Sequence, residues 1–447
     1  MSQGNEFANG VPTSRAVSVA FIATCPPRQC GIATFTRNLV RAVMAADPGI
    51  RPCWVAIDDA DSIHPYGPEV RWRIKQGQVD TYRRAAEQLN LSRVNLVNLQ
   101  HEFGLYGIWG DPFEDHLVPF LETLRKPLVT TLHTVLPAPS PSVREAIWRL
   151  CVHSRVVIVM TNIARQLLIS QYGLDPPKVV VIPHGMPPIE PRDRTRIKQR
   201  FGLMGRTLIS TFGLVDPRKG LEYMIGAMEC VREQHPDALY LIIGKTHPVL
   251  VRRVGEAYRN QLVEMVNARG LSQHVAFMDA YLTQQQIVDY LLATDVYVTP
   301  YLDPNQITSG TLAYALGAGK AVVSTPYLHA SEALADGRGV LVDFRSEEQL
   351  ATAVNRILDN PRLQQQLELR ARAYGCNRDW PTVGRRMARL LRDVAQPLQS
   401  EVETQQLVGL ARHDRANLAI WHSTPALSAD AGTSEDQPPL LASGRAQ

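Results

Sequence analysis

Residues 296–326 read VYVTPYLDPNQITSGTLAYALGAGKAVVSTP, and this stretch decides the fold. Its β-branched and aromatic start predicts a buried strand, which the DPN turn at residues 303–305 ends. Residues 308–311, Thr-Ser-Gly-Thr, are typical of the start of a helix, and residues 321–326 predict a second strand. A strand, a helix and a second strand in this order form the repeating unit of an α/β fold with a parallel sheet.

The same alternation extends along most of the chain. In the first half, apolar runs predict strands at residues 17–23, 53–57, 95–99, 127–132, 156–160 and 179–182. In the second half, further strands are predicted at residues 207–212, 238–243, 275–278 and 339–342. A proline-containing, charged segment at residues 189–196 separates the two series. The fold class is therefore α/β, with two doubly wound domains.

These patterns predict five segments along the chain. They are a disordered N-terminus (1–14), a first Rossmann-like domain (15–188), a second one (189–377), a C-terminal helix (378–397) and a mostly disordered tail (398–447). The tail is rich in Ser, Pro, Ala, Gly and Asp, a composition that buries too little apolar surface to fold.

Composition argues against several classes of function. A net charge of only +4 over 447 residues argues against a dedicated nucleic-acid-binding protein, which usually carries a strongly basic face. The six cysteines form no Cys-x-x-Cys pair, which favours a reducing compartment and no zinc site. The N-terminus lacks an apolar signal core, and no apolar run approaches roughly twenty residues. We expect a cytoplasmic protein, with peripheral contact to the inner membrane as an alternative.

Polar residues follow several predicted strands of the first half. Gly31 begins a helix after the first strand, where a glycine permits close approach of a ligand or only serves the turn. His101 and Glu102 follow the third strand, and His133 follows the fourth. Each histidine suits either substrate contact or a hydrogen bond inside the fold. The acidic residues at 58–61 suit either a divalent metal or, as we favour, a solvated loop.

The second half places cations and a helix start at the corresponding strand ends. Arg218 and Lys219 stand before Gly220, where two cations suit a diphosphate or form an exposed basic turn. The helix start at residues 308–311 offers hydroxyls and free backbone N–H groups to an anion, or is an ordinary N-cap.

Together these features resemble the family 4 glycosyltransferases, also called glycosyl transferases group 1. The resemblance covers about residues 17–395, and its motifs lie at residues 31–39, 131–134, 181–185, 216–222 and 317–323. It implies two Rossmann-like domains facing each other across a cleft, the GT-B arrangement. The first domain would bind the acceptor and the second a nucleotide sugar, and the last helix would cross back to the first domain.

The resemblance also assigns roles to individual residues. Catalytic roles would fall to His133, Lys219 and Arg218. The donor would contact Gly31, Gly213, Thr246, His247, Gln306, Thr308, Ser309, Gly310, Thr311 and Tyr314, with the diphosphate held by the amides of residues 309–311. His101 and Glu102 would lie on the acceptor side, and His184 and Gly185 at the hinge.

Two departures from the family pattern affect the mechanism. Gln306 and Tyr314 stand where the family usually has two glutamates, so no carboxylate can act as a nucleophile at either position. Leu214 stands where the family usually has an arginine, and we assign that role to Arg218.

The resemblance therefore implies a retaining glycosyltransferase that moves a hexose from a GDP-mannose or UDP-glucose type of donor to a saccharide or lipid-linked acceptor. We expect it to be metal-independent, because the chain itself supplies the cations. It needs no cofactor, because the nucleotide sugar is a substrate. Alternatives are a disaccharide phosphorylase, a nucleotide-sugar epimerase and a non-catalytic sugar-nucleotide binding protein. Basic residues around a tryptophan at residues 71–75 also suit either a membrane surface or a solvated face.

Overall fold

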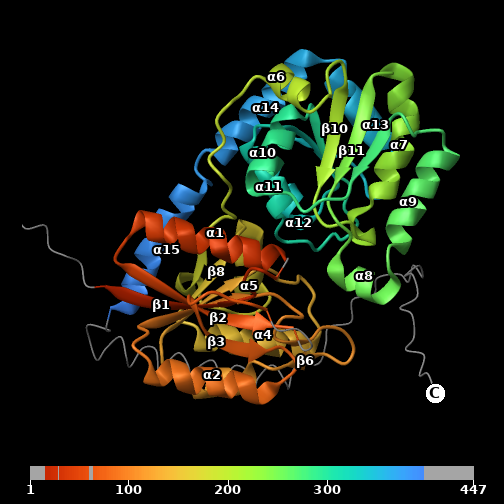
Figure 1. Cartoon of the computed structure of the whole chain (residues 1–447). Coiled ribbons are helices and arrows are strands. Elements are labelled where there is room, and N and C mark those ends of the chain that lie inside the picture. Colours follow the sequence, from red (N-terminus) through yellow and green to blue (C-terminus); the bar gives the residue numbers. More distant parts are fainter. Residues whose placement is uncertain (1–15, 29, 60–63, 397–447) are drawn as a thin grey trace, which may run out of the picture. The chain divides into compact units, whose positions relative to one another are not determined.

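The computed structural model describes residues 16–28, 30–59 and 64–396. The predictions for residues 1–14 and for the tail after 397 lie outside the described residues. The chain forms two parallel sheets covered by helices (Figure 1), which confirms the predicted α/β class.

The first sheet has seven strands in the order β3-β2-β1-β4-β7-β8-β9. Their bounds are β1 Val17–Ala23, β2 Ile50–Asp58, β3 Val70–Lys75, β4 Leu96–His101, β7 Leu128–Leu132, β8 Val156–Val159 and β9 Val179–Val181. The pairs within the sheet are parallel. A small antiparallel hairpin, β5 Gly107–Ile108 and β6 Glu114–Asp115, follows β4.

Helices cover both faces of this sheet, because alternate strand residues point to opposite sides. Ile22 and Val55 face a core made with α2 Val79–Leu91, α3 Val118–Thr123, α4 Pro141–His153 and α5 Asn162–Ser170. Phe21 and Trp54 face a second core, made with α1 Gly31–Ala46 and α15 Trp380–Ala395. The last helix of the described chain therefore packs beside α1, as Figure 1 shows in blue and red.

The second sheet has six strands in the order β12-β11-β10-β13-β14-β15. Their bounds are β10 Thr207–Phe212, β11 Ala238–Ile243, β12 Val275–Met278, β13 Val296–Thr299, β14 Ala321–Ser324 and β15 Val340–Leu341. All were predicted from the sequence, within a few residues at the ends.

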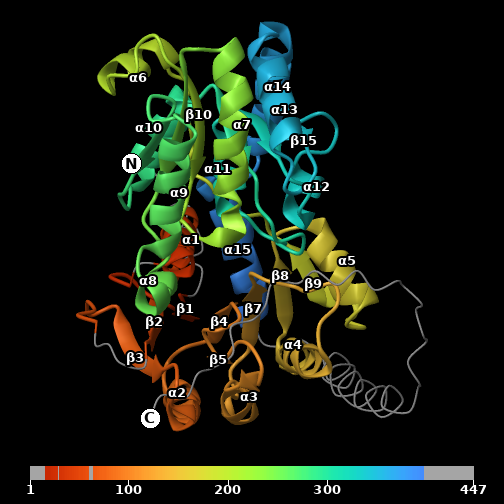
Figure 2. The same cartoon turned by 90° about the vertical axis from the view of Figure 1, so that its right-hand side faces the viewer.

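This sheet also lies between two layers of helices. One face packs on α7 Leu221–Gln234, α9 Ala257–Ala268 and α13 Glu347–Leu358, and Figure 2 shows α7 and α9 in front of the strands. The other face packs on α6 Arg194–Arg200, α10 Gln284–Ala293, α11 Gly310–Gly317, α12 Leu328–Ala333 and α14 Pro361–Gly375. The short helix α8 Pro248–Val254 follows β11.

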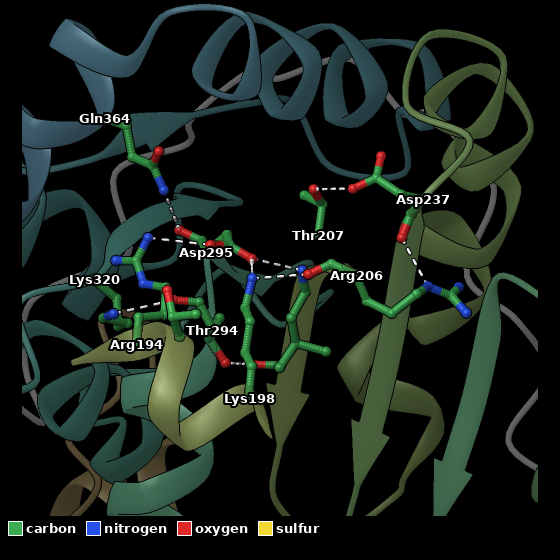
Figure 3. Close-up of polar contacts among 12 residues, drawn as sticks. Arg194, Lys198, Arg206, Thr207, Asp237, Thr294, Asp295, Lys320 and Gln364 are labelled. Carbon is green, nitrogen blue, oxygen red and sulfur yellow. Dashed lines mark hydrogen bonds and ion pairs between the residues drawn. The ribbon is translucent and has the colours of Figure 1, made fainter. Parts of the chain in front are cut away.

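A charged network ties α6 to the amino end of this sheet (Figure 3). Asp295, just before β13, accepts hydrogen bonds from the backbone N–H of Leu208 at 2.7 Å and from Arg194 at 3.1 Å, and it pairs with Lys198. Nearby, the buried Lys320 donates to the carbonyl of Thr294 at 3.0 Å. Because the partners compensate these charges, the network anchors the segment that leads into the second domain.

The chain passes twice between the two domains, and the two passages are hydrogen-bonded to each other. The N–H of Met186 donates to the carbonyl of Arg378 at 3.1 Å, and the N–H of Trp380 donates to the carbonyl of Met186 at 2.7 Å. A Cβ on Gly185 would lie 2.2 Å from the Trp380 ring, so the two passages touch only because residue 185 has no side chain.

Three strands of the described chain were not predicted: β3 and the short hairpin strands β5 and β6. The basic segment at residues 71–75 forms β3, the edge strand, in which Ile74 is buried and Arg71, Arg73 and Lys75 are exposed. Charged residues on an edge strand discourage pairing with another chain. None of the helices in the described part of the chain is long and apolar enough to cross a bilayer.

Candidate functional site

Both sheets reverse their strand order next to a central pair, β1 and β4 in the first and β10 and β13 in the second. In open α/β sheets, ligands bind outside the carboxyl ends of the strands at this reversal point. The loops after these four strands carry most of the predicted site residues. The geometry of these loops therefore decides which of the predicted site residues lie close together.

Lys219 lies close to the start of α11 through Tyr301. The Lys219 ammonium is 3.7 Å from the centre of the Tyr301 ring, and the Tyr301 hydroxyl is 2.8 Å from the Thr311 hydroxyl. Burial lowers the pKa of Lys219 to about 8, with the Arg218 charge as a smaller cause. Gly220 makes this turn possible, because a Cβ there would lie 2.2 Å from the carbonyl of Pro300. The second sheet thus presents a cation and a helix N-terminus together.

The N-terminus of α11 offers two amides, not the three that were predicted. The N–H of Ser309 donates to Nδ1 of His329 at 2.7 Å, and the Ser309 hydroxyl accepts from the N–H of Leu312. The amide of Ser309 is therefore already paired. No described residue accepts from the amides of Gly310 and Thr311, which are the first two donors of the helix.

Arg218 differs from the expectation of two free cations. Its guanidinium binds both carboxylate oxygens of Asp216, at 2.9 and 3.0 Å, which raises the pKa of Arg218. The side chain is 70% exposed. Since Asp216 pairs with Arg218, Lys219 is the cation of this loop that has no ion pair among the described residues.

Gly31 begins α1 with open space around it. A Cβ at this position would meet nothing within 4 Å, and its φ is not in the left-handed region. The turn therefore does not require a glycine here, which removes the simpler of the two explanations. Close approach of a ligand to the backbone stays a prediction.

His133 is a neutral, buried residue at the end of β7. Its Nε2 is 2.9 Å from the side-chain oxygen of Gln100, and its ring meets the edge of Phe35 with 4.8 Å between the ring centres. Burial, with smaller effects from His184 and His101, lowers its pKa to about 3. An uncharged imidazole can exchange hydrogen bonds with sugar hydroxyls but contributes no positive charge.

His101 and Glu102 lie beside it at the end of β4. His101 is 6% exposed, it stacks on Tyr106, and its Nδ1 has no hydrogen-bond partner among the described residues. Glu102 accepts from the Thr134 hydroxyl and from the N–H of Phe103, both at 2.9 Å. Burial raises the pKa of Glu102 to about 7, although these bonds and the Arg218 charge oppose the shift.

His184 lies at the start of α11 as well as in the passage between the domains. A Cβ on Gly310 would lie 2.9 Å from its Nε2, and its Nδ1 is 2.7 Å from the carbonyl of Gly185. Burial lowers the pKa of His184 to about 4. It was predicted only as a hinge residue, and the structure adds it to the surroundings of the α11 amides.

Tyr314 and Gln306, which replace the family glutamates, both have neighbours within the protein. Tyr314 is 8% exposed, and its hydroxyl lies beside the side chains of Asn38 and Trp380, at the junction of the two domains. Contact of Tyr314 with the donor stays a prediction. Gln306 donates to the carbonyl of Thr308 at 3.2 Å.

Gly213, Thr246 and His247 separate into two groups. Gly213 lies against Thr311, since a Cβ there would be 3.4 Å from the Thr311 methyl group. Thr246 is buried and bonded to Glu256 and Arg259, and the ring of His247 accepts from the N–H of Val249. The last two side chains therefore support their own loop, and their contact with the donor stays a prediction.

Two family models match this chain. Glycosyltransferase Family 4 matches residues 31–188, and Glycosyl transferases group 1 matches residues 193–374. The chain belongs to glycosyltransferase family 4. The order of the two matches agrees with the two sheets, so the first sheet of this glycosyltransferase corresponds to one model and the second sheet to the other.

Relatives and solved structures agree with this assignment. A GDP-mannose-dependent alpha-(1-6)-phosphatidylinositol monomannoside mannosyltransferase from Mycolicibacterium smegmatis is 26% identical over 266 residues, 56% of this chain and 65% of the relative. The chain thus spans just under two thirds of that protein. Sucrose-phosphate synthase from Thermosynechococcus elongatus has a TM-score of 0.66 at 17% identity, covering 85% of this chain and 99% of that one.

A second solved structure has the same arrangement of domains. Anabaena HepE in complex with UDP and glucose has a TM-score of 0.64 at 16% identity, covering 84% of this chain and 100% of that one. At such identities the likeness concerns the fold alone. This family 4 glycosyltransferase therefore has two Rossmann-like domains in the GT-B arrangement.

Several residues of the site were not predicted. Tyr301 supports Lys219, His329 binds the amide of Ser309, and Phe35 contacts both His133 and His184. Tyr301 could have been found as an aromatic residue directly after a buried strand. Phe35 lies in the motif at residues 31–39 but was given no role, and no sequence signal connects His329 with the site.

The described residues contain no group of three or more His, Cys, Asp or Glu side chains arranged to hold a metal ion. Asp58 accepts from the Tyr66 hydroxyl and Asp59 pairs with Arg28. Asp61 lies outside the described residues. Independence of a metal stays a prediction for this glycosyltransferase.

Proposed function

We propose that this protein transfers a hexose from a nucleotide-diphosphate sugar, of the GDP-mannose or UDP-glucose type, to a saccharide or lipid-linked acceptor. The anomeric configuration is retained in this reaction, and neither a metal ion nor a cofactor takes part. The second domain binds the donor and the first domain the acceptor.

One observation carries the proposal: Lys219 and the α11 amides lie at the same strand-order reversal of the second sheet. The ammonium of Lys219 contacts Tyr301, whose hydroxyl reaches Thr311 in the first turn of α11. A point charge and oriented N–H groups stabilise phosphate oxygens, above all when negative charge grows on a leaving group. This arrangement supports diphosphate binding at that point.

The chemistry then needs little acid–base machinery. The bond between C1 of the sugar and the diphosphate oxygen breaks, and the acceptor oxygen bonds to C1 on the same face. The departing diphosphate takes the acceptor's proton. Gln306 and Tyr314 provide no carboxylate that could form a covalent intermediate. The neutral imidazoles of His133 and His184 exchange hydrogen bonds with sugar hydroxyls or phosphate oxygens.

Named relatives support the class of donor. The Mycolicibacterium relative uses GDP-mannose, and the Anabaena structure contains UDP and glucose. Both proteins handle a hexose and a nucleoside diphosphate, which is the chemistry that we propose here. The nucleotide base of the donor stays open, because one name contains GDP and the other UDP.

The test begins with donor binding. GDP-mannose and UDP-glucose are added separately, and the midpoint of heat unfolding is compared with that in free GDP, UDP and buffer. A ligand at one hundred times its Kd stabilises the folded state by about 2.7 kcal/mol. The donor that protects is then incubated with candidate acceptors, and the anomeric configuration of the product is read by NMR. An inverted product, or a need for a metal ion after chelation, contradicts the proposal.

A further inference from the structure

The loop after Glu102 exposes an aromatic surface that the proposed reaction does not use. Trp109 is 50% exposed and stacks on Phe103, with 4.4 Å between ring centres and 29° between ring planes. Phe113 meets Trp109 edge-on at 6.1 Å. We call Phe103, Trp109 and Phe113 the aromatic platform. Trp109 is exposed while Phe103 and Phe113 are partly buried, and contiguous exposed apolar surface can mark a binding site.

The platform is held in place by its base. The hydroxyl of the buried Tyr106 donates to the carbonyl of Gln100 in β4 at 2.9 Å and to that of Ile22 in β1 at 3.2 Å. These bonds fasten the loop that follows β4 to both strands. The N–H of His116 donates to the carbonyl of Tyr106 at 2.8 Å. Because both ends of the β5–β6 hairpin are anchored, the exposure of Trp109 belongs to the folded loop and not to a frayed segment.

A small pocket lies between the platform and the carboxyl end of β4. Its lining includes His101, Glu102, Phe103, Phe113 and Asp115, and its volume of about 10 Å³ is room for roughly one water molecule. His101 is 6% exposed and its Nδ1 has no partner among the described residues. A buried polar atom without a partner is costly unless a ligand or water completes its hydrogen bond. A sugar ring cannot enter this pocket, but a hydroxyl group can.

We propose that the aromatic platform and the His101 pocket form a carbohydrate subsite, on which a sugar ring of the acceptor stacks against Trp109 while one hydroxyl reaches into the pocket. The C–H face of a pyranose is apolar and suits an aromatic ring, while its hydroxyls need donors and acceptors. The platform supplies the aromatic rings, and the pocket at His101 and Glu102 supplies the polar atoms. The acceptor is then a saccharide of at least two sugars, one that receives the hexose and one on the platform.

The charges around the platform favour a saccharide over a lipid surface. The exposed tip includes Asp111, and Glu114 and Asp115 lie beside Phe113 in the wall of the pocket. Asp115 pairs with Arg149 at 4.0 Å, so Asp111 and Glu114 carry the negative charge that an anionic bilayer would repel. The same carboxylates can accept hydrogen bonds from sugar hydroxyls.

The position of the platform fits an acceptor subsite. Glu102 precedes Phe103, and the charge of Arg218 from the other domain acts on Glu102. The rings of His101 and Phe103 are 5.2 Å apart, and those of Phe103 and Trp109 are 4.4 Å apart, so the platform continues outward from the reaction site. The inference rests on the proposed function, because it assumes that transfer occurs between the two sheets.

The test measures binding of four named sugars: glucose, maltose, mannose and α-1,6-mannobiose. Calorimetric titration is done on the wild type, on Trp109→Ala, Trp109→Glu and Trp109→Phe, and on Leu369→Ala, an exposed apolar residue on α14 that serves as the matched control. The wild type should bind one of the disaccharides about tenfold or more tightly than its monosaccharide. Trp109→Ala and Trp109→Glu should lose that difference, while Trp109→Phe and Leu369→Ala retain it.

Other outcomes overturn the proposal. It fails if no disaccharide binds the wild type better than its monosaccharide, or if Trp109→Ala and Trp109→Glu bind as the wild type does while keeping its unfolding temperature. Trp109-dependent sedimentation with phosphatidylglycerol vesicles, without competition by sugars, would assign the platform to a membrane instead. Protection of the wild type against heat unfolding by GDP-mannose or UDP-glucose is measured in parallel. It distinguishes failure of the subsite from failure of the proposed function: if neither nucleotide sugar protects, the proposed function has failed as well.

Discussion

The two sheets have similar strand orders but differ in charge at their carboxyl ends. In the first sheet, the strand ends carry His101 and His133, both neutral because burial lowers their pKa to about 3, and Glu102, whose pKa burial raises to about 7. In the second sheet, they carry Lys219 and the free amides of α11. One edge suits uncharged hydroxyls and the other suits phosphate oxygens.

This difference shows how one fold serves two substrates. The backbone supplies the same edge twice, and only the residues after the strands decide what is bound. Burial acts on both edges, but it neutralises the histidines completely and leaves Lys219 with a pKa close to physiological pH. The predictions below test whether the division between a neutral edge and a cationic edge holds.

The largest effect is expected from removing the cation of the second edge. Lys219→Ala should lower kcat by roughly a hundred- to a thousand-fold, which is typical for the loss of one group that stabilises a developing anion. Lys75→Ala, an exposed lysine on β3, is the matched control and should keep the wild-type rate. Steady-state kinetics with the protecting donor measures both, and the heat-unfolding curve confirms that Lys219→Ala folds. An unchanged kcat in that variant removes the diphosphate assignment.

The pH dependence of kcat/KM should follow the same residue. Lys219 must be protonated to bind the diphosphate, and burial lowers its pKa to about 8, so kcat/KM should fall about tenfold per pH unit above that value. Lys219→Arg keeps its proton at these pH values and should lose this alkaline limb, even though its absolute rate is lower. A profile from pH 6 to 10 on both proteins decides the matter. The same limb in Lys219→Arg would mean that another group titrates.

Substitution of one glycine at each edge should affect the stability of the protein very differently. Gly244→Ala should destabilise the protein by about 1–3 kcal/mol or more, because its φ is 145° and a Cβ would lie 1.9 Å from the carbonyl of Gly213. Gly31→Ala should change stability by less than about 0.5 kcal/mol, since its Cβ meets nothing.

Kinetics complete the comparison of these glycines. Gly31→Ala should raise the KM for the donor if the backbone of α1 approaches the phosphates. Urea unfolding and donor titration are measured on both variants. A stable Gly31→Ala with the wild-type KM would show that the first turn of α1 does not touch the donor.

The smallest effect concerns Glu102 and the pH dependence of stability. Its folded pKa of about 7 lies above the ordinary value of 4.5, so the folded state binds more protons than the unfolded state between these values. Glu102 therefore favours folding most below about pH 4.5, and that contribution is lost as the pH rises through 7. Glu102→Gln should remove this dependence. Its unfolding temperature, relative to that of the wild type, should be higher at pH 8 than at pH 5, and the reverse order would contradict the burial of this carboxylate.

Much of the fold was predictable because buried parallel strands leave a strong pattern. The second sheet follows from runs such as residues 238–243, in which every residue is buried. The strand β3 was missed because it alternates basic residues with Trp72 and Ile74 at the edge of the sheet. An edge strand with one exposed face has no continuous apolar run, so its composition resembled a basic surface.

The site was predictable only in part. Lys219 lies in the loop after β10, and Gly310 and Thr311 begin the helix after β13, so their proximity follows from the parallel order of those strands. The pairing of Ser309 with His329, of Arg218 with Asp216 and of Thr246 with Glu256 was not foreseen, because each pairing depends on side-chain directions within loops.

The sequence by itself determined which residues stand at the strand ends, because apolar runs and the turns that end them are local properties of the chain. It also determined the two-domain plan, through the repeated alternation of strands and helices. Only the tertiary structure decided which of those residues are free to bind a ligand. A donor or acceptor is available only when no neighbour satisfies it, and a charge keeps or loses its proton according to burial, so both depend on segments that are distant in sequence and close in space.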